Sequence, residues 1–437
     1  MVAVPSGAAG ACPSVRTGTV AGTRVTVPHM RILVVNSGSS SVKFRLTDVL
    51  DERGAIASRP ALLEGAVKSI GGRATLHMSG PQQSSSSATT IEARDHAQAM
   101  RVILNRLNDV LNGIEAVGHR VVHGGELYVE STVITDEVEA GIDGLSELAP
   151  LHNPACLAGI RGAKAVLGST VPMVAVFDTA FHRTMPEVAR QYAIPTDLAE
   201  RHGIRRYGFH GIAHASLANG YAACTGTSVT QSRIITLQLG NGCSVAAIAE
   251  GQSVETSMGF TPLEGLVMGT RSGDVDASLV SFVAQREKVE SAEVERWLNE
   301  RSGLLGVSGR SNDMRELLRA AEQEQDQRAE FAIDLFCYRA RKYDGAYLAV
   351  LGGADAIVFG GGIGEHAPEV RKRICRGMEW CGINLDADRN QTAVALRQGS
   401  AAKISTDGST PAVYVVAADE ETWIAKETAR CVRAITS

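Results

Sequence analysis

The chain has 437 residues and a formal net charge of −5, with 44% hydrophobic and 21% charged residues. This length predicts two domains, and the composition is that of a globular protein. No Lys/Arg-rich run and no unbroken apolar stretch of membrane-spanning length occurs, so we expect no nucleic-acid partner and no membrane partner. The eight cysteines are scattered without a C-x-x-C pair, which favours reduced thiols in a cytoplasmic protein over disulfides or a zinc ribbon.

Residues 1–29 are rich in Gly, Ala, Thr and Val, and they lack the basic start and continuous apolar middle of a signal peptide. We interpret them as a disordered leader or as the result of an upstream start codon, with Met30 as the alternative start. Residues 31–35 form an apolar run, 36–41 a polar turn cluster, and 42–46 an alternation of apolar and basic residues. This succession predicts a β-hairpin around a polar loop.

A helix and two strands are predicted next along the chain. Apolar residues recur at helical spacing over 94–112. Residues 116–125 predict a strand that runs into a glycine turn, and 171–177 predict a buried strand. Each strand carries a polar residue near its end, Arg120 in the first and Asp178 after the second.

A further strand, over 234–239, is followed by the loop Gly240-Asn-Gly-Cys and by another strand over 244–248. The same local form, a strand, a Gly/Asn loop and a strand, therefore occurs at Asn36 and at Asn241, about half a chain length apart. A duplicated nucleotide-binding domain would produce this repeat, although hairpins with Gly/Asn turns are common.

The last third of the chain predicts a strand, a glycine turn and a helix in succession. A long amphipathic helix over 329–350 precedes a short strand over 355–359. The turn Gly-Gly-Gly-Ile-Gly-Glu follows at 360–365, and 368–378 has helical character. Bare backbone can approach a phosphate or nucleotide at such a turn. A final strand over 413–416 leads into a terminal helix.

Several known motifs are absent. The sequence has no P-loop, no protein-kinase signature set and no H-E-x-x-H, and the glycines at 360–364 do not fit the dinucleotide fingerprint. Two H-x-x-x-H spacings occur, His119/His123 and His210/His214, but neither has an acidic neighbour suited to a zinc hydrolase. A metal site is therefore disfavoured at both spacings.

Polar residues at strand ends and in glycine-rich loops remain as candidates for chemistry. Singly, each has an ordinary explanation as a turn residue, a surface ion pair, a helix N-cap or a first-turn acid. Together they supply the Arg, Lys and carboxylate groups that phosphoryl transfer needs, because its catalysis is mostly positioning and charge neutralisation. These candidates are Asn36, Lys43, Arg120, Asp178, Arg271 and Glu420.

Six segments resemble the signatures of the acetate kinase family, and they occur in the family's order. They include Gly-Phe-His-Gly at 208–211 and Pro-Leu-Glu-Gly-Leu-Val-Met-Gly-Thr-Arg-Ser-Gly-Asp at 262–274. The six are 36–44, 118–125, 148–154, 177–182, 206–211 and 262–274.

The resemblance implies an α/β fold of two ribonuclease-H-like domains, as in actin-like ATPases and sugar kinases, with a nucleotide cleft between the domains. Domain I would comprise 30–181 plus 422–437, and domain II, which binds the nucleotide, would comprise 182–421. The implied reaction is reversible, Mg²⁺-dependent, direct in-line phosphoryl transfer between ATP and acetate, giving acetyl phosphate and ADP. Mn²⁺ is an alternative metal, and the family resemblance also implies a homodimer.

The resemblance also implies roles for individual residues. The arginines would hold the carboxylate and the transferring phosphoryl group, and the histidines and the asparagine would contact that phosphoryl group. The catalytic set is Arg120, His152, Asp178, His210, Asn241 and Arg271. The apolar pocket for the methyl group, next to Arg120, is Val122, Leu151, Phe209 and Pro262. Asn36 and Glu420, with Asp178 nearby, would surround the metal. The nucleotide contacts are Lys43, Gly240, Asn241, Gly242, Asp313, Met314, Arg315, Gly361, Gly362, Ile363, Gly364 and Glu365.

Two positions depart from the family pattern. Gln238 stands where the family usually has His, and His366 stands where it usually has Asn. An amide cannot carry a positive charge, so any charge role at position 238 is in question. Three alternatives stay open: a propionate or butyrate kinase, a sugar kinase of the same superfamily, and a non-catalytic nucleotide-binding module. A pocket of apolar side chains favours a short-chain carboxylate over a sugar.

Overall fold

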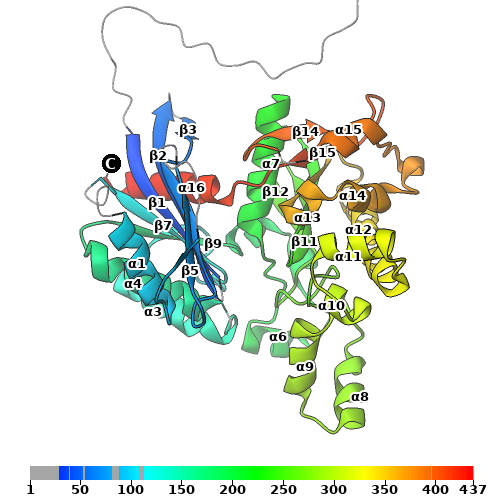
Figure 1. Ribbon diagram of the computed structural model, residues 1–437, viewed down its shortest axis with the longest axis horizontal. Helices are drawn as coiled ribbons and strands as arrows, with labels where there is room; N and C mark the ends of the chain where they lie inside the picture. Colours follow the sequence, from blue (N-terminus) through cyan, green and yellow to red (C-terminus); the bar gives the residue numbers. More distant parts are fainter. Residues whose placement is uncertain are drawn as a thin grey trace, which may run out of the picture.

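The computed structural model describes residues 29–38, 40–52, 55–80, 88–107, 113–150, 152–394 and 396–436, which form two α/β halves, each built on one sheet (Figure 1). Nearly all of the predicted leader, residues 1–28, and the predicted pocket residue Leu151 lie outside the described residues. No helix in the described ranges is long and apolar enough to span a membrane.

The first sheet has the strand order β6-β5-β4-β2-β1-β7-β9-β8, with β3 beside β2. β1 pairs antiparallel with β2 and parallel with β7, which in turn pairs parallel with β9. Residues 32–35 of β1 are fully buried, as expected for a central strand covered on both faces. The strands are β1 (His29–Gly38), β2 (Ser41–Glu52), β3 (Ala55–Ser58), β4 (Leu63–Lys68), β5 (Thr75–Ser79), β6 (Thr89–Thr90), β7 (Ala116–Val121), β8 (Thr132–Val133) and β9 (Met173–Phe177).

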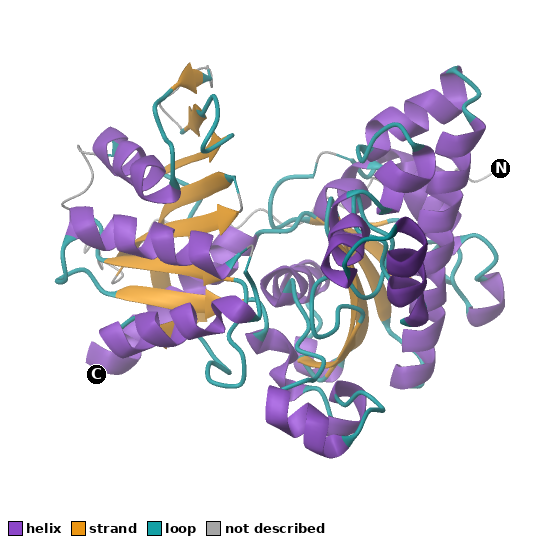
Figure 2. Ribbon diagram, turned by 90° about the horizontal axis from the view of Figure 1, so that it is seen from below, coloured by secondary structure: helices purple, strands orange, loops and turns teal. Residues whose placement is uncertain are grey.

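Helices cover both faces of the first sheet (Figure 2). Helices α1 (His96–Arg106) and α4 (Asn153–Leu167) pack together on one face, with α3 (Asp136–Gly144) and the 3₁₀ turn η1 (Leu145–Glu147) beside α4. The terminal helix α16 (Glu420–Thr436) packs against β1, β7 and β9. The C-terminal helix α16 therefore covers the sheet that contains the first strand, β1.

The second sheet repeats the core of the first. Its order is β12-β11-β10-β13-β15-β14, in which β10 pairs antiparallel with β11 and parallel with β13, and β13 pairs parallel with β15. The two predicted hairpins are therefore confirmed, and each is followed by the same pair of parallel strands. The strands are β10 (Arg233–Leu239), β11 (Cys243–Ala249), β12 (Gln252–Thr256), β13 (Ala356–Gly360), β14 (Ala401–Lys403) and β15 (Ala412–Val416).

The helices of the second half include the predicted long helix, which is α12 (Gln327–Leu351). Its start is capped by the Asp326 carboxylate and its end by Gly352 in the left-handed conformation. The other helices are α5 (Glu187–Arg190), α6 (Thr196–His202), α7 (Gly211–Thr225), α8 (Ser278–Glu287), α9 (Ser291–Glu300), α10 (Gly303–Ser308), α11 (Met314–Gln323), α13 (Gly361–His366), α14 (Pro368–Cys375) and α15 (Ala387–Thr392), with 3₁₀ turns η2 (Ala180–Thr184), η3 (Val229–Gln231) and η4 (Glu379–Cys381).

The chain passes between the two halves at two places. The first follows β9, where Asp178 and η2 lead toward α7, and the second follows β15, where residues 417–419 lead into α16. Helix α7 packs against β10 and β13 of the second sheet and also against η2 and α16. Polar residues at the two crossings are therefore brought toward the same region.

Candidate functional site

Arg120 and Asp178 form an ion pair at the ends of neighbouring parallel strands. Arg120 Nη2 and Nε donate to Asp178 Oδ2 at 2.5 and 3.0 Å, and Arg120 Nη1 donates to Asn36 Oδ1 at 3.1 Å. β1 and β7 pair Asn36 directly with Arg120, so the register of the sheet sets this contact. Burial lowers the pKa of Arg120, but the negative charges of Asp178 and Glu420 outweigh it and leave the pKa above its ordinary value.

Glu420 begins α16 at the second crossing between the halves. Burial raises the pKa of its carboxyl group to about 7, although the positive charge of Arg120 acts in the opposite direction. The structure thus brings Asn36, Arg120, Asp178 and Glu420 together, although they are far apart in the sequence. A carboxylate held in a buried place without its own ion pair is suited to a cation that arrives with a substrate.

His210 and Arg271 meet above the loop between β10 and β11. A Cβ atom on Gly242 would lie 3.3 Å from His210 Nε2 and 3.7 Å from Arg271 Nη1, so both groups border this glycine. Arg271 Nη1 donates to the Pro262 carbonyl at 3.1 Å, and no carboxylate among the described residues pairs with it. Burial lowers the pKa of Arg271, and burial together with Arg120 and Arg271 lowers the pKa of His210 to about 3. A neutral imidazole and a guanidinium without a carboxylate partner among the described residues therefore both lie next to Gly242.

An apolar cavity of about 600 Å³ opens beside Arg271, between the two halves. Val122 and His152 line it from the first half, and Phe209, Pro262 and Arg271 line it from the second. Burial, followed by the charges of Arg271 and Arg120, lowers the pKa of His152 to about 4. The predicted pocket residues other than Leu151 thus line one cavity together with His152 and Arg271. Its wall also has a polar part, formed by Glu295, Arg296, Asn299 and Glu300.

A second cavity, of about 460 Å³, lies on the second half near the same loop. Seven predicted nucleotide residues line it, namely Gly240, Asn241, Asp313, Met314, Arg315, Gly362 and Ile363. Asn312 also lines it and donates to Asn241 Oδ1 at 3.0 Å. Asp313 caps α11 by accepting from the Arg315 amide at 2.9 Å, so its carboxylate already has a local partner.

The glycine turn after β13 is shaped by close backbone contacts. Gly361 has φ +73°, and a Cβ there would lie 2.6 Å from the Leu239 carbonyl oxygen, so only glycine fits. Glu365 Oε1 accepts hydrogen bonds from the amides of Gly361 and Ala418, at 3.0 and 3.1 Å. Gly364 is buried in α13. The Glu365 carboxylate therefore ties the turn to the crossing before α16.

A third cavity, of about 540 Å³, extends the cleft between β2, β4 and β5 and the glycine turn. Lys43 lines it from the first half, and Gln238 and Gly361 line it from the second. Glu420 also borders it. Gln238 Oε1 is buried without a hydrogen-bond partner among the described residues. The first of the two departures from the family pattern, Gln238, therefore lines this cavity, and the second, His366, lines the nucleotide-side cavity.

The residues around Glu420 offer a small set of oxygen donors for the implied magnesium ion. No group of three or more His, Cys, Asp or Glu side chains in the described ranges could hold a metal by itself. Mg²⁺ usually takes one or two carboxylates and completes its shell with water and substrate phosphates. The half-buried Glu420 carboxylate, which borders the cleft, fits that sparse protein contribution together with the Asn36 and Asp178 oxygens nearby.

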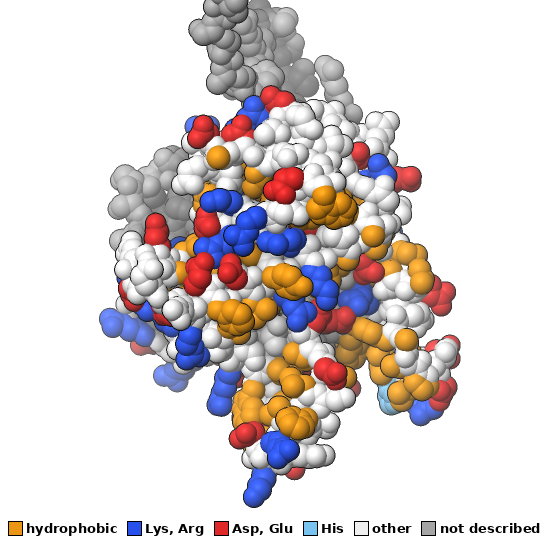
Figure 3. All heavy atoms as spheres, turned by 90° about the vertical axis from the view of Figure 1, so that its right-hand side faces the viewer, with side chains coloured by type: hydrophobic (Ala, Val, Ile, Leu, Met, Phe, Trp, Pro, Cys, Tyr) orange, Lys and Arg blue, Asp and Glu red, His pale blue; other side chains and the backbone are white. Residues whose placement is uncertain are grey.

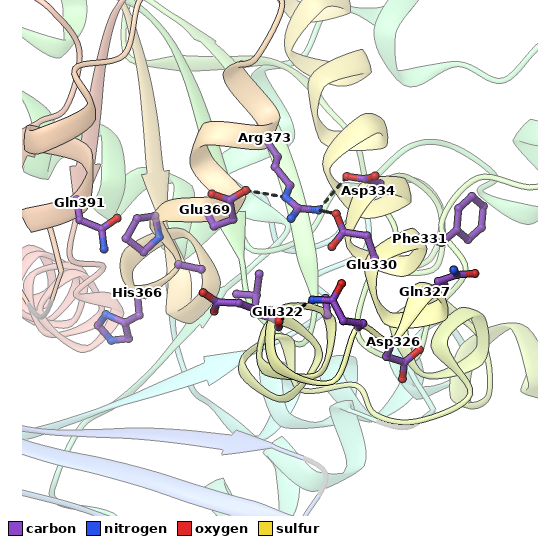
Figure 4. Close-up of a pocket in the computed structure, with 15 residues that line it drawn as sticks. Glu322, Asp326, Gln327, Glu330, Phe331, Asp334, His366, Glu369, Arg373 and Gln391 are labelled. Atoms are coloured by element: carbon purple, nitrogen blue, oxygen red, sulfur yellow. Dashed lines mark hydrogen bonds and ion pairs between the residues drawn. The ribbon is translucent and has the colours of Figure 1, made fainter.

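Figure 4 shows a further cavity, of about 850 Å³, between α11 and α12 on one side and α13 and α14 on the other. Arg373 crosses it and bonds to Glu369, Glu330 and Asp334 at 2.9, 2.8 and 3.0 Å. The outer face of this half carries charges of both signs among separate apolar areas (Figure 3). Its acids are largely matched by the arginine, so we assign this cavity no role in the chemistry.

Some residues at the site were not identified from the sequence. Ser244 Oγ bonds to both His210 and His214, and Asn312 lines the nucleotide-side cavity. The spacing of four between His210 and His214 is visible in the sequence, but as a metal-binding pattern it does not point to Ser244. A serine in a strand that follows a Gly/Asn loop gave no signal by itself.

Two sheets of the same core topology, with a polar cleft between them, define a protein of two actin-like ATPase domains. The acetokinase family model matches residues 31–426, and the chain belongs to that family. It is 48% identical to the acetate kinase of Solibacter usitatus over 92% of this chain and 98% of that protein. It is 45% identical to the acetate kinase of Chloroherpeton thalassium, over 92% and 99%.

Solved structures agree with this assignment. The crystal structure of Porphyromonas gingivalis acetate kinase is 39% identical, with a TM-score of 0.83 over 92% of this chain and 100% of that chain. A propionate kinase from Francisella tularensis is 36% identical, also with a TM-score of 0.83, over 92% and 99%. The fold is thus shared by relatives named for different short carboxylates.

Proposed function

We propose that this protein is an acetate kinase that transfers the γ-phosphoryl group of ATP to acetate, reversibly, giving acetyl phosphate and ADP. The observation that carries the proposal is the convergence of Arg271 and the neutral His210 over Gly242, beside an apolar cavity. An unpaired buried cation suits an anionic substrate, and an apolar wall suits its methyl group. The names of the relatives support the same reaction.

In the proposed mechanism, acetate places its methyl group against Val122, Phe209 and Pro262, and its carboxylate faces the arginines. A carboxylate oxygen attacks the γ-phosphorus in line, and the bond to the β–γ bridging oxygen breaks to release ADP. No general base is needed because acetate is ionised at neutral pH. Arg271 and the Nε2 of His210 stabilise the charge on the moving phosphoryl group, with His152 and Asn241 contacting its oxygens.

The nucleotide binds, in this proposal, along the glycine turn and the cavity lined by 313–315, with Lys43 reaching its phosphates from the first half. Asn36, Asp178 and Glu420 would hold Mg²⁺, or Mn²⁺ in its place. When bound, that ion neutralises phosphate charge. Asp178 has a second role, because it orients Arg120 through the ion pair.

We also propose how the chain is divided into domains and how it assembles. Domain I comprises 30–181 plus 422–437, and domain II comprises 182–421, which is consistent with the packing of α16 on the first sheet. A homodimer in the cytoplasm is proposed from the family. Sedimentation analysis of the purified chain tests the homodimer, and cell fractionation tests the cytoplasmic location.

The experiment that tests the function traps acyl phosphate with hydroxylamine. Purified protein is given Mg·ATP with acetate, propionate, butyrate or glycerol in parallel. We expect a strong signal with acetate that falls as the carboxylate lengthens, and none with glycerol. A signal that peaks with propionate would replace acetate by propionate as the substrate. No acyl phosphate with any carboxylate, despite ATP binding, would favour a nucleotide-binding module instead.

A further inference from the structure

Four side chains form a continuous hydrogen-bonded line from the interior of the second sheet to the cleft. Thr236 Oγ1 lies 2.7 Å from His214 Nδ1, and His214 Nε2 lies 2.8 Å from Ser244 Oγ. Ser244 Oγ lies 2.8 Å from His210 Nδ1. The register of β10 and β11 and the four-residue spacing of the two histidines at the start of α7 produce this line, which ends at the His210 Nε2 beside Gly242.

The line is closed to solvent at its inner end. Thr236, His214 and Ser244 are all fully buried, and their side chains make no other hydrogen bond within the described ranges. Burial keeps the pKa of His214 well below its ordinary value, and the pKa of His210 is about 3. Both imidazoles are therefore neutral at physiological pH, and each carries one N–H, on either Nδ1 or Nε2.

Counting protons leaves two arrangements of this line. Ser244 has one hydroxyl proton between two imidazole nitrogens, so in every arrangement that uses this buried proton it donates to one ring and accepts from the other. In the first arrangement Thr236 donates to His214, His214 to Ser244, and Ser244 to His210 Nδ1. His210 then carries its proton on Nε2. In the second arrangement every bond is reversed, and His210 Nε2 is a bare acceptor.

Thr236 distinguishes the two arrangements. In the first, its hydroxyl proton is used by His214 Nδ1. In the second, His214 donates to the Thr236 oxygen, and the Thr236 proton is left buried with no acceptor among the described residues. A buried donor without an acceptor is costly, so the first arrangement is favoured even without substrate. Hydrogen bonds that run in one direction also strengthen one another.

We propose that Thr236, His214 and Ser244 are positioning residues that hold His210 as its Nε2–H tautomer, so that a neutral N–H donor faces the transferring phosphoryl group. This inference deepens the proposed function and rests on it for the identity of the group that faces Nε2. The tautomer itself is a property of the free protein. A bare nitrogen at this place would direct its lone pair at phosphoryl oxygens, which are themselves acceptors.

The test measures the tautomer directly, by ¹⁵N NMR of the protein labelled at its histidine rings, with His210→Asn used to assign the His210 signals. We expect wild-type His210 to be protonated at Nε2. Thr236→Val removes the hydroxyl at nearly constant volume and is expected to populate the Nδ1–H form. Thr236→Ser restores the hydroxyl and the wild-type tautomer. Thr428→Val, which removes another fully buried threonine hydroxyl, on α16, is the matched control.

Kinetics follow from the same variants. We expect Thr236→Val and Ser244→Ala to lower kcat by roughly 10- to 100-fold. Removing one preorganised donor outright typically lowers kcat by about 10²- to 10³-fold, so the expected effect is smaller. KM for both substrates should stay within about twofold, because the donor acts mainly on the transition state. Thr428→Val should leave kcat and the His210 tautomer unchanged.

Two results would overturn the inference: a wild-type His210 protonated at Nδ1, or an unchanged Nε2–H tautomer in both Thr236→Val and Ser244→Ala. If Thr236→Val does not fold, the wild-type tautomer and Ser244→Ala still decide the question. An Nε2–H tautomer in a protein that forms no acyl phosphate would refute the proposed function and leave the hydrogen-bonded line standing.

Discussion

Two nitrogen atoms of Arg120, Nε and Nη2, donate to the same carboxylate oxygen of Asp178. Asp178 is 1% exposed, so its charge is matched almost entirely by this guanidinium. Breaking a buried ion pair from one side leaves the other charge unmatched. We therefore expect Asp178→Asn to lower the free energy of unfolding by about 3 kcal/mol, the usual loss for such a pair. Urea denaturation at pH 7 measures this.

The same variant should also lose activity. Without the carboxylate, Arg120 is no longer held by Asp178, and a proposed metal contact is lost. We expect kcat to fall at least 100-fold or so, as when one preorganised electrostatic group is removed. Asp388→Asn, an exposed change on α15, serves as the control and should alter neither quantity. A variant with wild-type stability and turnover would show that the ion pair has neither role.

Removing the charge of Arg271 should not lower stability, in contrast to removing the charge of Asp178. It has no carboxylate partner in the described ranges, and burial already lowers its pKa, so its charge is held at a cost to the fold. We expect Arg271→Met to reduce acyl phosphate formation by orders of magnitude while the melting temperature stays equal or rises. A melting temperature that falls with the activity would indicate a structural role instead.

The choice between carboxylate substrates should depend on the apolar residues that line the cavity beside Arg271. Val122 is 4% exposed and lines the apolar cavity with Phe209 and Pro262. Removing two methyl groups there makes room for one more methylene on the substrate, a difference worth about 1–3 kcal/mol. We expect Val122→Ala to raise the ratio of kcat/KM for propionate over acetate by roughly tenfold or more.

The control for this change is Val117→Ala, which trims a fully buried valine of β7 that does not line the cavity. It should lower stability and leave the substrate ratio alone. Equal ratios in Val122→Ala and wild type would place the methyl-binding wall elsewhere.

Asp344 makes stability depend on pH. It is fully buried in α12, and neither of its carboxylate oxygens has a hydrogen-bond partner among the described residues. Burial raises its pKa well above the ordinary value near 3.8. As the pH rises above that value, the unfolded chain loses the proton while the folded chain keeps it, so unfolding becomes easier by up to about 1.4 kcal/mol per pH unit.

Asp344→Asn removes this titration at nearly constant shape. We expect the variant to gain stability over wild type progressively from pH 5 to pH 8, with little difference near pH 4. Urea unfolding across that range provides the measurement. A constant offset between the two proteins at every pH would mean that Asp344 is ionised in the folded state.

Much of the fold was predictable because its signals are local. The hairpins around Asn36 and Asn241 follow from apolar runs joined by polar turns, and both are present. The helix predicted over 329–350 is α12, and the strand, glycine turn and helix after it are β13, α13 and α14. The helix predicted over 94–112 is shorter in the described residues, where α1 ends at Arg106.

The remaining features depend on contacts between distant residues, which periodicity does not encode. Arg120 and Asp178 are 58 residues apart, and their pairing follows from the register of parallel strands. Ser244 reaches His214 of α7 and His210, which directly precedes that helix, only because β11 lies next to β10. The burial of Asp344 has no signal in the sequence, since one acid in an amphipathic helix normally faces solvent. The carboxylate of Glu365, predicted to contact adenosine, is bonded to two backbone amides.

The two passages of the chain between the halves have a mechanical consequence. Asp178 and Glu420 lie at these passages, so they are close to any axis about which one half turns on the other. In a rotation, displacement grows with distance from the axis. Opening the cleft therefore separates its outer rim far more than it separates the charged residues at its base, where Arg45 of β2 bonds to Asp419. Nucleotides can be exchanged through the rim while the innermost charges keep their spacing.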